Sequence, residues 1–210
     1  EGTVMDSNSR QWFIHAKDAI GVRSRARVLA TLVDKYIHND IESDWVSLAS
    51  GAAIPVLEAL CAAKLDGQKV HLSLVDDDPV ALRWAETMAA QQGLVVGEQI
   101  TLLRRNLVYH LIRNDDLVLE LGEQQAELVD ALGIFEYFNH DDAVTFLKRA
   151  LRLVKPGGAV ILSNMLNTSP QIDFALRCIG WQHLFPRSLD ELQEIHLAAG
   201  VPVENVTVVV

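Results

Sequence analysis

Cysteine, long apolar runs and an excess of positive charge are all lacking in this sequence. Its only two cysteines, Cys61 and Cys178, are far apart, and neither belongs to a C-x-x-C pair. This argues against a disulfide framework and against a zinc site, so we expect no bound metal. We expect both cysteines to be buried as small hydrophobic side chains.

No apolar stretch approaches the roughly 20 residues that a membrane span needs. The first ten residues, EGTVMDSNSR, lack the apolar centre of a signal peptide. We therefore predict a soluble, cytoplasmic protein that does not bind membranes. Lysine and arginine number 18 against 28 aspartates and glutamates, a formal net charge of −10. This charge disfavours nucleic acid as a partner, although it does not exclude an RNA bound by a local basic patch.

The 210 residues are half hydrophobic and 22% charged, which is typical of one globular domain. Short apolar strands alternate with amphipathic helices along the chain. We expect strands over residues 44–51, 69–76, 98–105, 126–133, 159–166 and 201–210. A first helix is expected from an apolar stripe of Val22, Ala26, Leu29, Val33 and Tyr36. Further helices are expected at 53–65, 79–92, 144–154 and 188–200, and residues 106–115 are expected to form a short helix or an irregular crossover. Ser188 and Glu191, three residues apart, are expected to form a capping box at the start of the last helix.

This alternation predicts an α/β protein with a doubly wound, mostly parallel Rossmann-like sheet and helices on both of its faces. We divide the chain into an N-terminal helical extension, residues 1–43, and a Rossmann-like domain, residues 44–210. Such sheets bind ligands beyond the carboxyl ends of their strands, near the point where strand order reverses. The residues that follow each strand are therefore the candidate site residues.

The first strand is followed by a turn of small residues, Ala49, Ser50, Gly51, Ala52 and Ala53. Small side chains let a ligand approach the backbone closely, and the helix that follows offers free N–H groups. A tight connection packed with small residues, without a ligand, would give the same pattern.

The second strand ends in three aspartates. Asp76 leaves the strand first, and its carboxylate is placed to accept hydrogen bonds from both ribose hydroxyls of an adenosine ligand. Asp77 is a second candidate, whereas Asp78 precedes Pro79 and is expected to cap the next helix. After the third strand, Asn106 is a candidate for binding the adenine edge, with Leu107 against the ring. A turn built by the Asn106 side chain is the alternative.

The order of these features resembles the class I S-adenosylmethionine-dependent methyltransferases over about residues 45–165. WVSLASGAA matches that family's first glycine motif in position, with Gly51 as its central glycine and Ser47 where the family has an acidic residue. Glu127 replaces the usual aspartate of the fourth strand. LKRALRLVKPGGAVILSNM is similar to the family's helix, Lys-Pro-Gly-Gly turn and fifth strand.

The resemblance implies S-adenosyl-L-methionine as cofactor and a methyl transfer as the reaction. It implies that the cofactor is held by the turn after the first strand, by the residues after the second and third, and by Ala131 and Leu132 after the fourth. An arginine-bearing helix before the first strand is similar to a lid segment in some members, so Arg25, or alternatively Arg23, is a candidate ligand for the cofactor's carboxylate. A solvated helix face would explain the same arginine.

On the acceptor side, Glu136 and His183 are candidates for removing a proton, and His183 is also readily explained as a surface histidine. We expect a small-molecule acceptor, because Asn164-Met165 does not match the Asn-Pro-Pro-Tyr type of signature of nucleobase and glutamine methyltransferases. Two alternatives are a non-catalytic S-adenosylmethionine-binding relative and an NAD(P)-dependent oxidoreductase. The sequence contains neither G-x-G-x-x-G nor Tyr-x-x-x-Lys, which disfavours the oxidoreductase.

Overall fold

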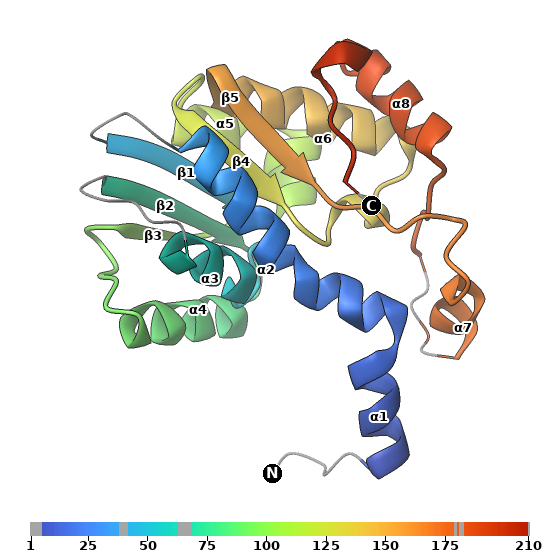
Figure 1. Ribbon diagram of the computed structural model, residues 1–210. Coiled ribbons are helices and arrows are strands. Elements are labelled where there is room, and N and C mark those ends of the chain that lie inside the picture. Colours follow the sequence, from blue (N-terminus) through green and yellow to red (C-terminus); the bar gives the residue numbers. More distant parts are fainter. Residues whose placement is uncertain (1–5, 38–41, 63–68, 179, 181–182, 210) are drawn as a thin grey trace.

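The computed structural model describes residues 6–37, 42–62, 69–178, 180 and 183–209. Five strands form one sheet in the order β3-β2-β1-β4-β5, and every neighbouring pair is parallel (Figure 1). The order reverses between β1 and β4, which is the switch point of a doubly wound sheet. The strands are β1 (Glu42–Leu48), β2 (Lys69–Asp76), β3 (Ile100–Arg104), β4 (Ala126–Ala131) and β5 (Val154–Leu162).

Helices cover both faces of this sheet, as the sequence predicts, with α2, α3 and α4 on one side and α5, α6 and α8 on the other (Figure 1). Each face has its own hydrophobic core, so the sheet is buried on both sides. The helices are α1 (Ser7–His15), α2 (Lys17–Tyr36), α3 (Ile54–Ala62), α4 (Pro79–Gln91), α5 (Asp116–Leu121), α6 (His140–Leu153), α7 (Ile172–Arg177) and α8 (Leu189–Ala198). Three short segments are η1 (Val108–Arg113), η2 (Phe135–Tyr137) and η3 (Val203–Asn205).

Local hydrogen bonds fix where several helices begin. Asp78 caps α4 by accepting from the amide of Val80 at 2.8 Å, as predicted. Ser188 and Glu191 form a reciprocal capping box at the start of α8, also as predicted. These caps hold the loops at the carboxyl ends of the strands, because each of these helices starts there.

The predicted strand over residues 201–210 is wrong for the residues that the structure describes, and Val210 lies outside them. Residues 203–205 form η3, and the amides of Asn205 and Val206 bond to the carbonyls of Pro202 and Val203. The segment is mostly exposed and makes these local bonds in place of a ladder with β5. Pro202, which has no N–H to donate, favours the same outcome.

The fifth strand begins earlier than predicted. Lys155-Pro156-Gly157-Gly158 was expected as a turn, but it lies within β5 as an irregularity of the register: Val154 pairs with Ala126, and Ala159 pairs with Leu128. A side chain at Gly158 would sit 2.5 Å from the carbonyl oxygen of Glu127, so only glycine fits this crossing of the two strands.

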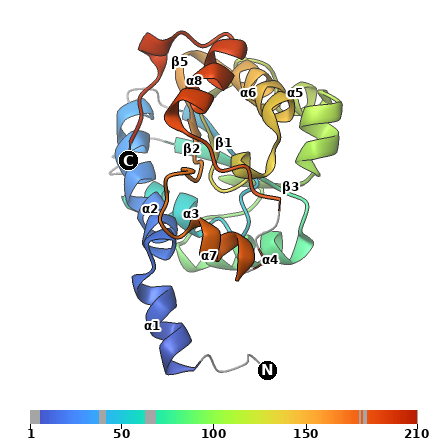
Figure 2. The same cartoon turned by 90° about the vertical axis from the view of Figure 1, so that its right-hand side faces the viewer.

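The N-terminal helices differ in their contacts. Leu29 and Val33 of α2 are buried against the core beneath α3, whereas α1 projects away from the sheet (Figures 1 and 2). The division at residue 43 stays a prediction, and β1 begins at Glu42. Within the described part of the chain, no helix is both long and apolar enough to cross a membrane. The expectation for the cysteines was wrong: Cys61 and Cys178 are both free and exposed.

Candidate functional site

The candidate site lies where the parallel strands end. Figure 2 looks onto this end of the sheet, with α2 along one side and α7 in front. The turns after β1, β2, β3 and β4 all open here because the four strands run in the same direction. Most of the predicted site residues are thereby brought to one edge of the sheet, with Arg25 joining them from α2.

The turn after β1 alternates between ordinary and left-handed backbone. Ala49, Gly51 and Ala53 have φ values of 54°, 55° and 55°. These are the positions of the three glycines in a G-x-G-x-G turn, so the sequence keeps the glycine backbone with two alanines in it. A left-handed residue with a Cβ costs roughly 1–2 kcal/mol. A methyl group built on Gly51 would meet nothing within 4 Å, so the space beside this backbone is open.

Replacing Ala49 with glycine should raise the free energy of unfolding by up to about 1 kcal/mol. The relief of left-handed strain exceeds the extra chain entropy of glycine, roughly 0.5–1 kcal/mol. Gly51→Ala should lower the free energy of unfolding by about 1–2 kcal/mol. Urea denaturation measures both, with Ala52→Gly as the control because Ala52 is not left-handed. Equal changes for Ala49→Gly and Ala52→Gly would show that the turn is unstrained.

Asp76 ties the ends of β1 and β2 together. Its Oδ2 accepts a hydrogen bond from the Gly51 amide at 2.8 Å, and its Oδ1 accepts from the Asp78 amide at 2.9 Å. The Ser50 amide donates to the carbonyl of Val75 at 3.1 Å. A carboxylate has about four lone-pair sites, so Asp76 keeps two of them for hydroxyl donors. The side chain is held rigidly beside the open backbone of the turn.

Polar atoms without partners mark the same edge. The hydroxyl oxygens of Ser50 and Ser163 and the Oε2 of Glu136 are buried, and none has a hydrogen-bond partner among the described residues. They follow β1, β5 and β4. Ser43, near the start of β1, has the same property. A buried polar atom left unpaired costs roughly 1–3 kcal/mol, and three such atoms at one edge of the sheet indicate a place where a ligand supplies the missing partners.

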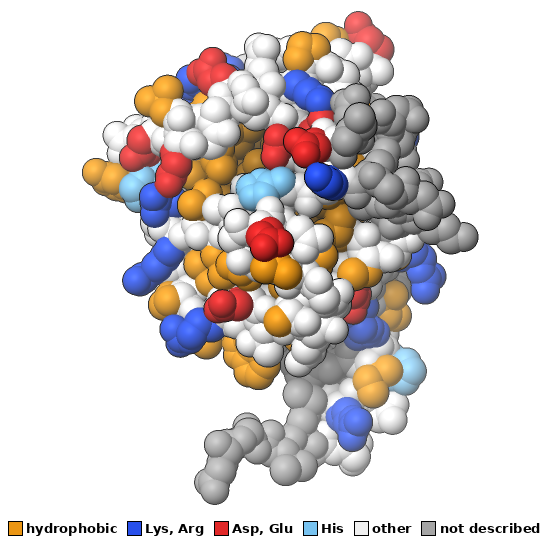
Figure 3. All heavy atoms as spheres, turned by 90° about the vertical axis from the view of Figure 1, so that its left-hand side faces the viewer, with side chains coloured by type: hydrophobic (Ala, Val, Ile, Leu, Met, Phe, Trp, Pro, Cys, Tyr) orange, Lys and Arg blue, Asp and Glu red, His pale blue; other side chains and the backbone are white. Residues whose placement is uncertain are grey.

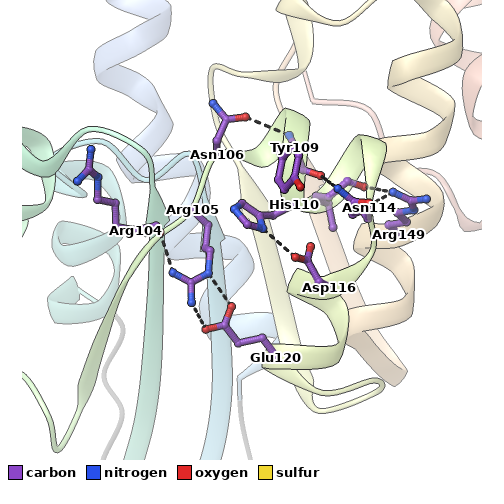
Figure 4. Close-up of polar contacts among 10 residues, drawn as sticks. Arg104, Arg105, Asn106, Tyr109, His110, Asn114, Asp116, Glu120 and Arg149 are labelled. Carbon is purple, nitrogen blue, oxygen red and sulfur yellow. Dashed lines mark hydrogen bonds and ion pairs between the residues drawn. The ribbon is translucent and has the colours of Figure 1, made fainter.

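The residues after β3 are engaged with one another (Figure 4). Asn106 donates through Nδ2 to Asp77 at 2.8 Å, and its Oδ1 accepts from the Tyr109 amide at 3.0 Å. The Asn106 side chain therefore forms a turn, the alternative to adenine binding that the sequence offered. One of its two Nδ2 hydrogens is left for a ligand. Leu107 is buried in the core. Arg105 makes a two-pronged contact with Glu120, which holds α5 against the end of β3.

Beyond β4 the chain meets α2. Ala131 is fully buried and Leu132 half-buried. Gly133 has φ 99°, and a Cβ there would lie 2.7 Å from Nη1 of Arg25. Only glycine therefore leaves room for the Arg25 side chain at this position. Arg25 Nη2 then lies 3.8 Å from Oε1 of Glu136. The structure thus joins two predicted residues, one from each side of the site.

Glu136 is a buried carboxylate at this edge, with 7% of its side chain exposed. Burial raises the pKa of its carboxyl, while its own backbone amide and the guanidinium groups of Arg25 and Arg187 oppose that rise. Burial and the neighbouring Glu136 also raise the pKa of the Tyr137 phenol. His183, the other predicted base, is exposed with φ 72°, and its catalytic role stays a prediction.

Arg187 is a site residue that the sequence did not indicate. Its Nη1 donates to the Phe135 carbonyl at 3.2 Å and to Asn164 Oδ1 at 2.6 Å, and its Nη2 donates to the carbonyl of Phe138. The guanidinium carbon also lies 5.2 Å from the centre of the Phe135 ring. Arg187 therefore holds the segments after β4 and β5 together, and burial lowers its pKa.

Asp130 is a second residue that sequence reasoning missed. It accepts from Trp45 Nε1 at 2.7 Å and from Ser47 Oγ at 3.1 Å, both on the neighbouring β1. Ser47 holds the place of the family's acidic residue, and the structure puts a buried carboxylate directly opposite it. Burial raises the pKa of Asp130 to about 7, and the hydrogen bonds from Trp45 and Ser47 oppose that rise without cancelling it.

A separate groove of about 330 Å³ lies at the other end of the sheet, between the first halves of β1, β2 and β3 and the end of α5. On this face, seen in Figure 3, histidine and acidic side chains lie close together. His71 contacts Asp44 at 3.5 Å and Thr101 at 3.0 Å. The groove is remote from the turns after the strands and is not the candidate site. The described residues include no group of three or more metal-ligating side chains.

The sequence matches no family model and no curated protein. Many solved structures resemble the fold, among them the mitomycin 7-O-methyltransferase MmcR, with 16% identity and a TM-score of 0.59 over 93% of this chain and 52% of that one. An O-methyltransferase family protein from Burkholderia thailandensis is 18% identical, with a TM-score of 0.59 over 95% of this chain and 59% of that one. The CurJ carbon methyltransferase is 10% identical, with a TM-score of 0.64 over 93% of this chain and 51% of that one.

The chain thus spans between half and three fifths of the length of these three structures. All three are methyltransferases, and their low identities make the likeness one of fold. The parallel sheet with its central switch point and two helical layers is therefore a Rossmann-like fold of the kind found in these methyltransferases.

Proposed function

We propose that the protein binds S-adenosyl-L-methionine at the carboxyl ends of β1, β2 and β4 and transfers its methyl group to a small-molecule acceptor. The observation that carries this proposal is the arrangement of Gly51 and Asp76. The amide of Gly51, in a left-handed turn with open space beside it, donates to Oδ2 of Asp76 at 2.8 Å. The Asp76 carboxylate keeps lone pairs for further donors. Few connections need a backbone of this kind unless a ligand lies against it.

The residues present fit the chemistry of that cofactor. Asp76 is suited to the ribose hydroxyls, and the unpartnered Ser50 hydroxyl and the amide of Ala52 offer polar contacts in the same turn. Asp77 and Asn106 close the adenosine side, with Leu107 behind them. Ala131 ends β4 and Leu132 follows it, while Arg25 of α2 reaches Gly133 beside them, where the methionine portion would extend. When bound, S-adenosylmethionine supplies an already activated methyl group, so the protein has to align the acceptor and exclude water.

A small-molecule acceptor is supported by the negative net charge of −10, which opposes attraction to nucleic acid. The O- and C-methyltransferases among the similar structures act on different atoms, so the fold leaves the acceptor atom open. A non-catalytic, cofactor-binding relative remains the second candidate because the family's first acidic residue is Ser47 here. Turnover of any acceptor decides between the two.

Asp76→Asn should weaken S-adenosylmethionine and S-adenosylhomocysteine binding about 5- to 30-fold, corresponding to 1–2 kcal/mol for polar groups left without a hydrogen-bond partner. Isothermal titration calorimetry measures this, with NAD as a competing ligand. Asp44→Asn is the matched control, because it removes the same charge from β1 at the opposite end of the sheet. Thermal melts verify that both variants fold.

Two results would contradict the cofactor assignment. One is a wild-type protein that binds NAD but neither S-adenosylmethionine nor S-adenosylhomocysteine. The other is an equal loss of affinity in Asp76→Asn and Asp44→Asn, since a charge effect without contact would act from both ends of the sheet.

A further inference from the structure

Glu136 is a buried acid whose structural partners leave one oxygen free. It lies in η2, just beyond β4, with its side chain 93% buried, and its Oε2 has no hydrogen-bond partner among the described residues. The nearby Arg187 donates to Phe135, Phe138 and Asn164 and not to Oε2. Arg25 is 3.8 Å from the other oxygen, Oε1. Neither arginine therefore satisfies Oε2.

The surroundings of Glu136 keep it ready to exchange a proton. Two guanidinium groups favour the ionised form, and burial favours the neutral form, with burial the larger influence on its pKa. A carboxylate whose pKa is raised above its ordinary value is a more effective general base than one at that value. His183 has no comparable enclosure, because its side chain is exposed.

The free oxygen defines what a ligand must bring. Oε2 of an ionised carboxylate can only accept, so its partner is an O–H or N–H group. A second unpartnered atom, Ser163 Oγ, lies directly after β5. The next residue, Asn164, accepts a hydrogen bond from Arg187. A carbon acceptor without such a hydrogen, a thioether or an ionised carboxylate would leave Oε2 unpaired at a cost.

Resting on the proposed function, we propose that the acceptor presents its reacting atom as a hydroxyl or an amine and that Glu136 takes its proton. The acceptor's oxygen or nitrogen forms the new bond to the methyl carbon. The carbon–sulfur bond breaks and leaves its electron pair on sulfur, which becomes a neutral thioether. The acceptor's proton passes to Oε2 of Glu136, and the carboxyl later returns it to water.

The test compares Glu136→Gln with the wild type and with Glu194→Gln, which removes the same charge from an exposed position of α8. Calorimetry with S-adenosylhomocysteine reports the cofactor site. Methyl transfer from S-adenosylmethionine is followed by mass spectrometry on a panel with matched rings: catechol, phenol, benzylamine, aniline, benzoate, thioanisole and the ether anisole. Glu136→Asp and a thermal melt of each variant separate misfolding from loss of the base.

We expect hydroxyl or amine compounds to be methylated by the wild type and by Glu194→Gln. In Glu136→Gln the kcat should fall at least 100-fold while S-adenosylhomocysteine affinity changes less than twofold. The rise of kcat/KM with pH should disappear in the same variant, whereas Glu136→Asp should retain it in part.

Four results would overturn the inference: unchanged turnover in Glu136→Gln, a tenfold loss of its cofactor affinity, methylation of benzoate or thioanisole alone, or cofactor binding without methylation of any hydroxyl or amine compound. A wild type that binds no S-adenosylhomocysteine fails at the earlier step and overturns the proposed function itself.

Discussion

Replacing Asp130 with asparagine should remove a large pH dependence from the stability of the fold. In the native protein burial raises the pKa of Asp130 to about 7 from an ordinary value of 3.8. Between these two values the folded state holds a proton that the unfolded state has released. The contribution of Asp130 to stability is therefore most favourable below about pH 4, falls as pH rises, and levels off above about pH 7.

The size of the effect follows from the shift. At about 1.4 kcal/mol per pKa unit, ionising Asp130 costs the folded state on the order of 4 kcal/mol at pH 8. Asparagine carries no charge, still accepts from Trp45 Nε1, and can donate to Ser47 Oγ. Asp130→Asn should therefore match the wild type near pH 4 and exceed it by several kcal/mol at pH 8.

Urea unfolding of both proteins from pH 4 to pH 8 measures this difference, and subtracting one curve from the other cancels the titration of the other carboxylates. A flat difference for Asp130→Asn would mean that its ionised form is stabilised by something other than Trp45 and Ser47.

Arg187→Met should destabilise the fold by about 3–5 kcal/mol, because three oxygen acceptors would lose their donor and each buried polar atom left unpaired costs roughly 1–3 kcal/mol. Methionine fills a similar volume but makes no hydrogen bond. The carbonyls of Phe135 and Phe138 and the amide oxygen of Asn164 would then lose their donor. Glu136 would also lose one of the two guanidinium groups that favour its ionised form.

Chemical denaturation gives the free energy of unfolding for this variant, and Arg177→Met serves as its control. Arg177 pairs with Asp173 on the surface of α7, with 79% of its side chain exposed, so its loss should change stability by less than about 0.5 kcal/mol. Similar small effects of both substitutions would show that the loops after β4 and β5 are held together without Arg187.

What could be predicted from the sequence was set by short-range signals. Asp78 as a cap and the Ser188–Glu191 box involve neighbours three residues apart or fewer, and both are confirmed. The place of Asp76 followed from strand alternation alone. The terminal strand failed because apolar valines suit a strand equally well whether or not an edge is there to pair with it.

The missed residues depend on contacts between distant parts of the chain. Asp130 finds its partners 83 and 85 residues away, and the Arg187 guanidinium reaches a carbonyl 52 residues earlier. Neither has a local pattern that distinguishes it from a surface charge. Asn106 was open between two roles, and the side chain of Asp77, 29 residues away, settles its orientation in the structure.

The two alanines in the turn after β1 also differ in how freely they should drift during evolution. The methyl group of Ala53 is buried in the core, with 1% exposure, so packing offsets its left-handed strain. Ala49 is only half-buried and gains less from its methyl group. Codons for alanine and glycine differ by a single base, and selection mainly removes variants that fall below a stability threshold. Lineages of this protein should therefore exchange alanine and glycine at position 49 readily, while position 53 should keep its alanine.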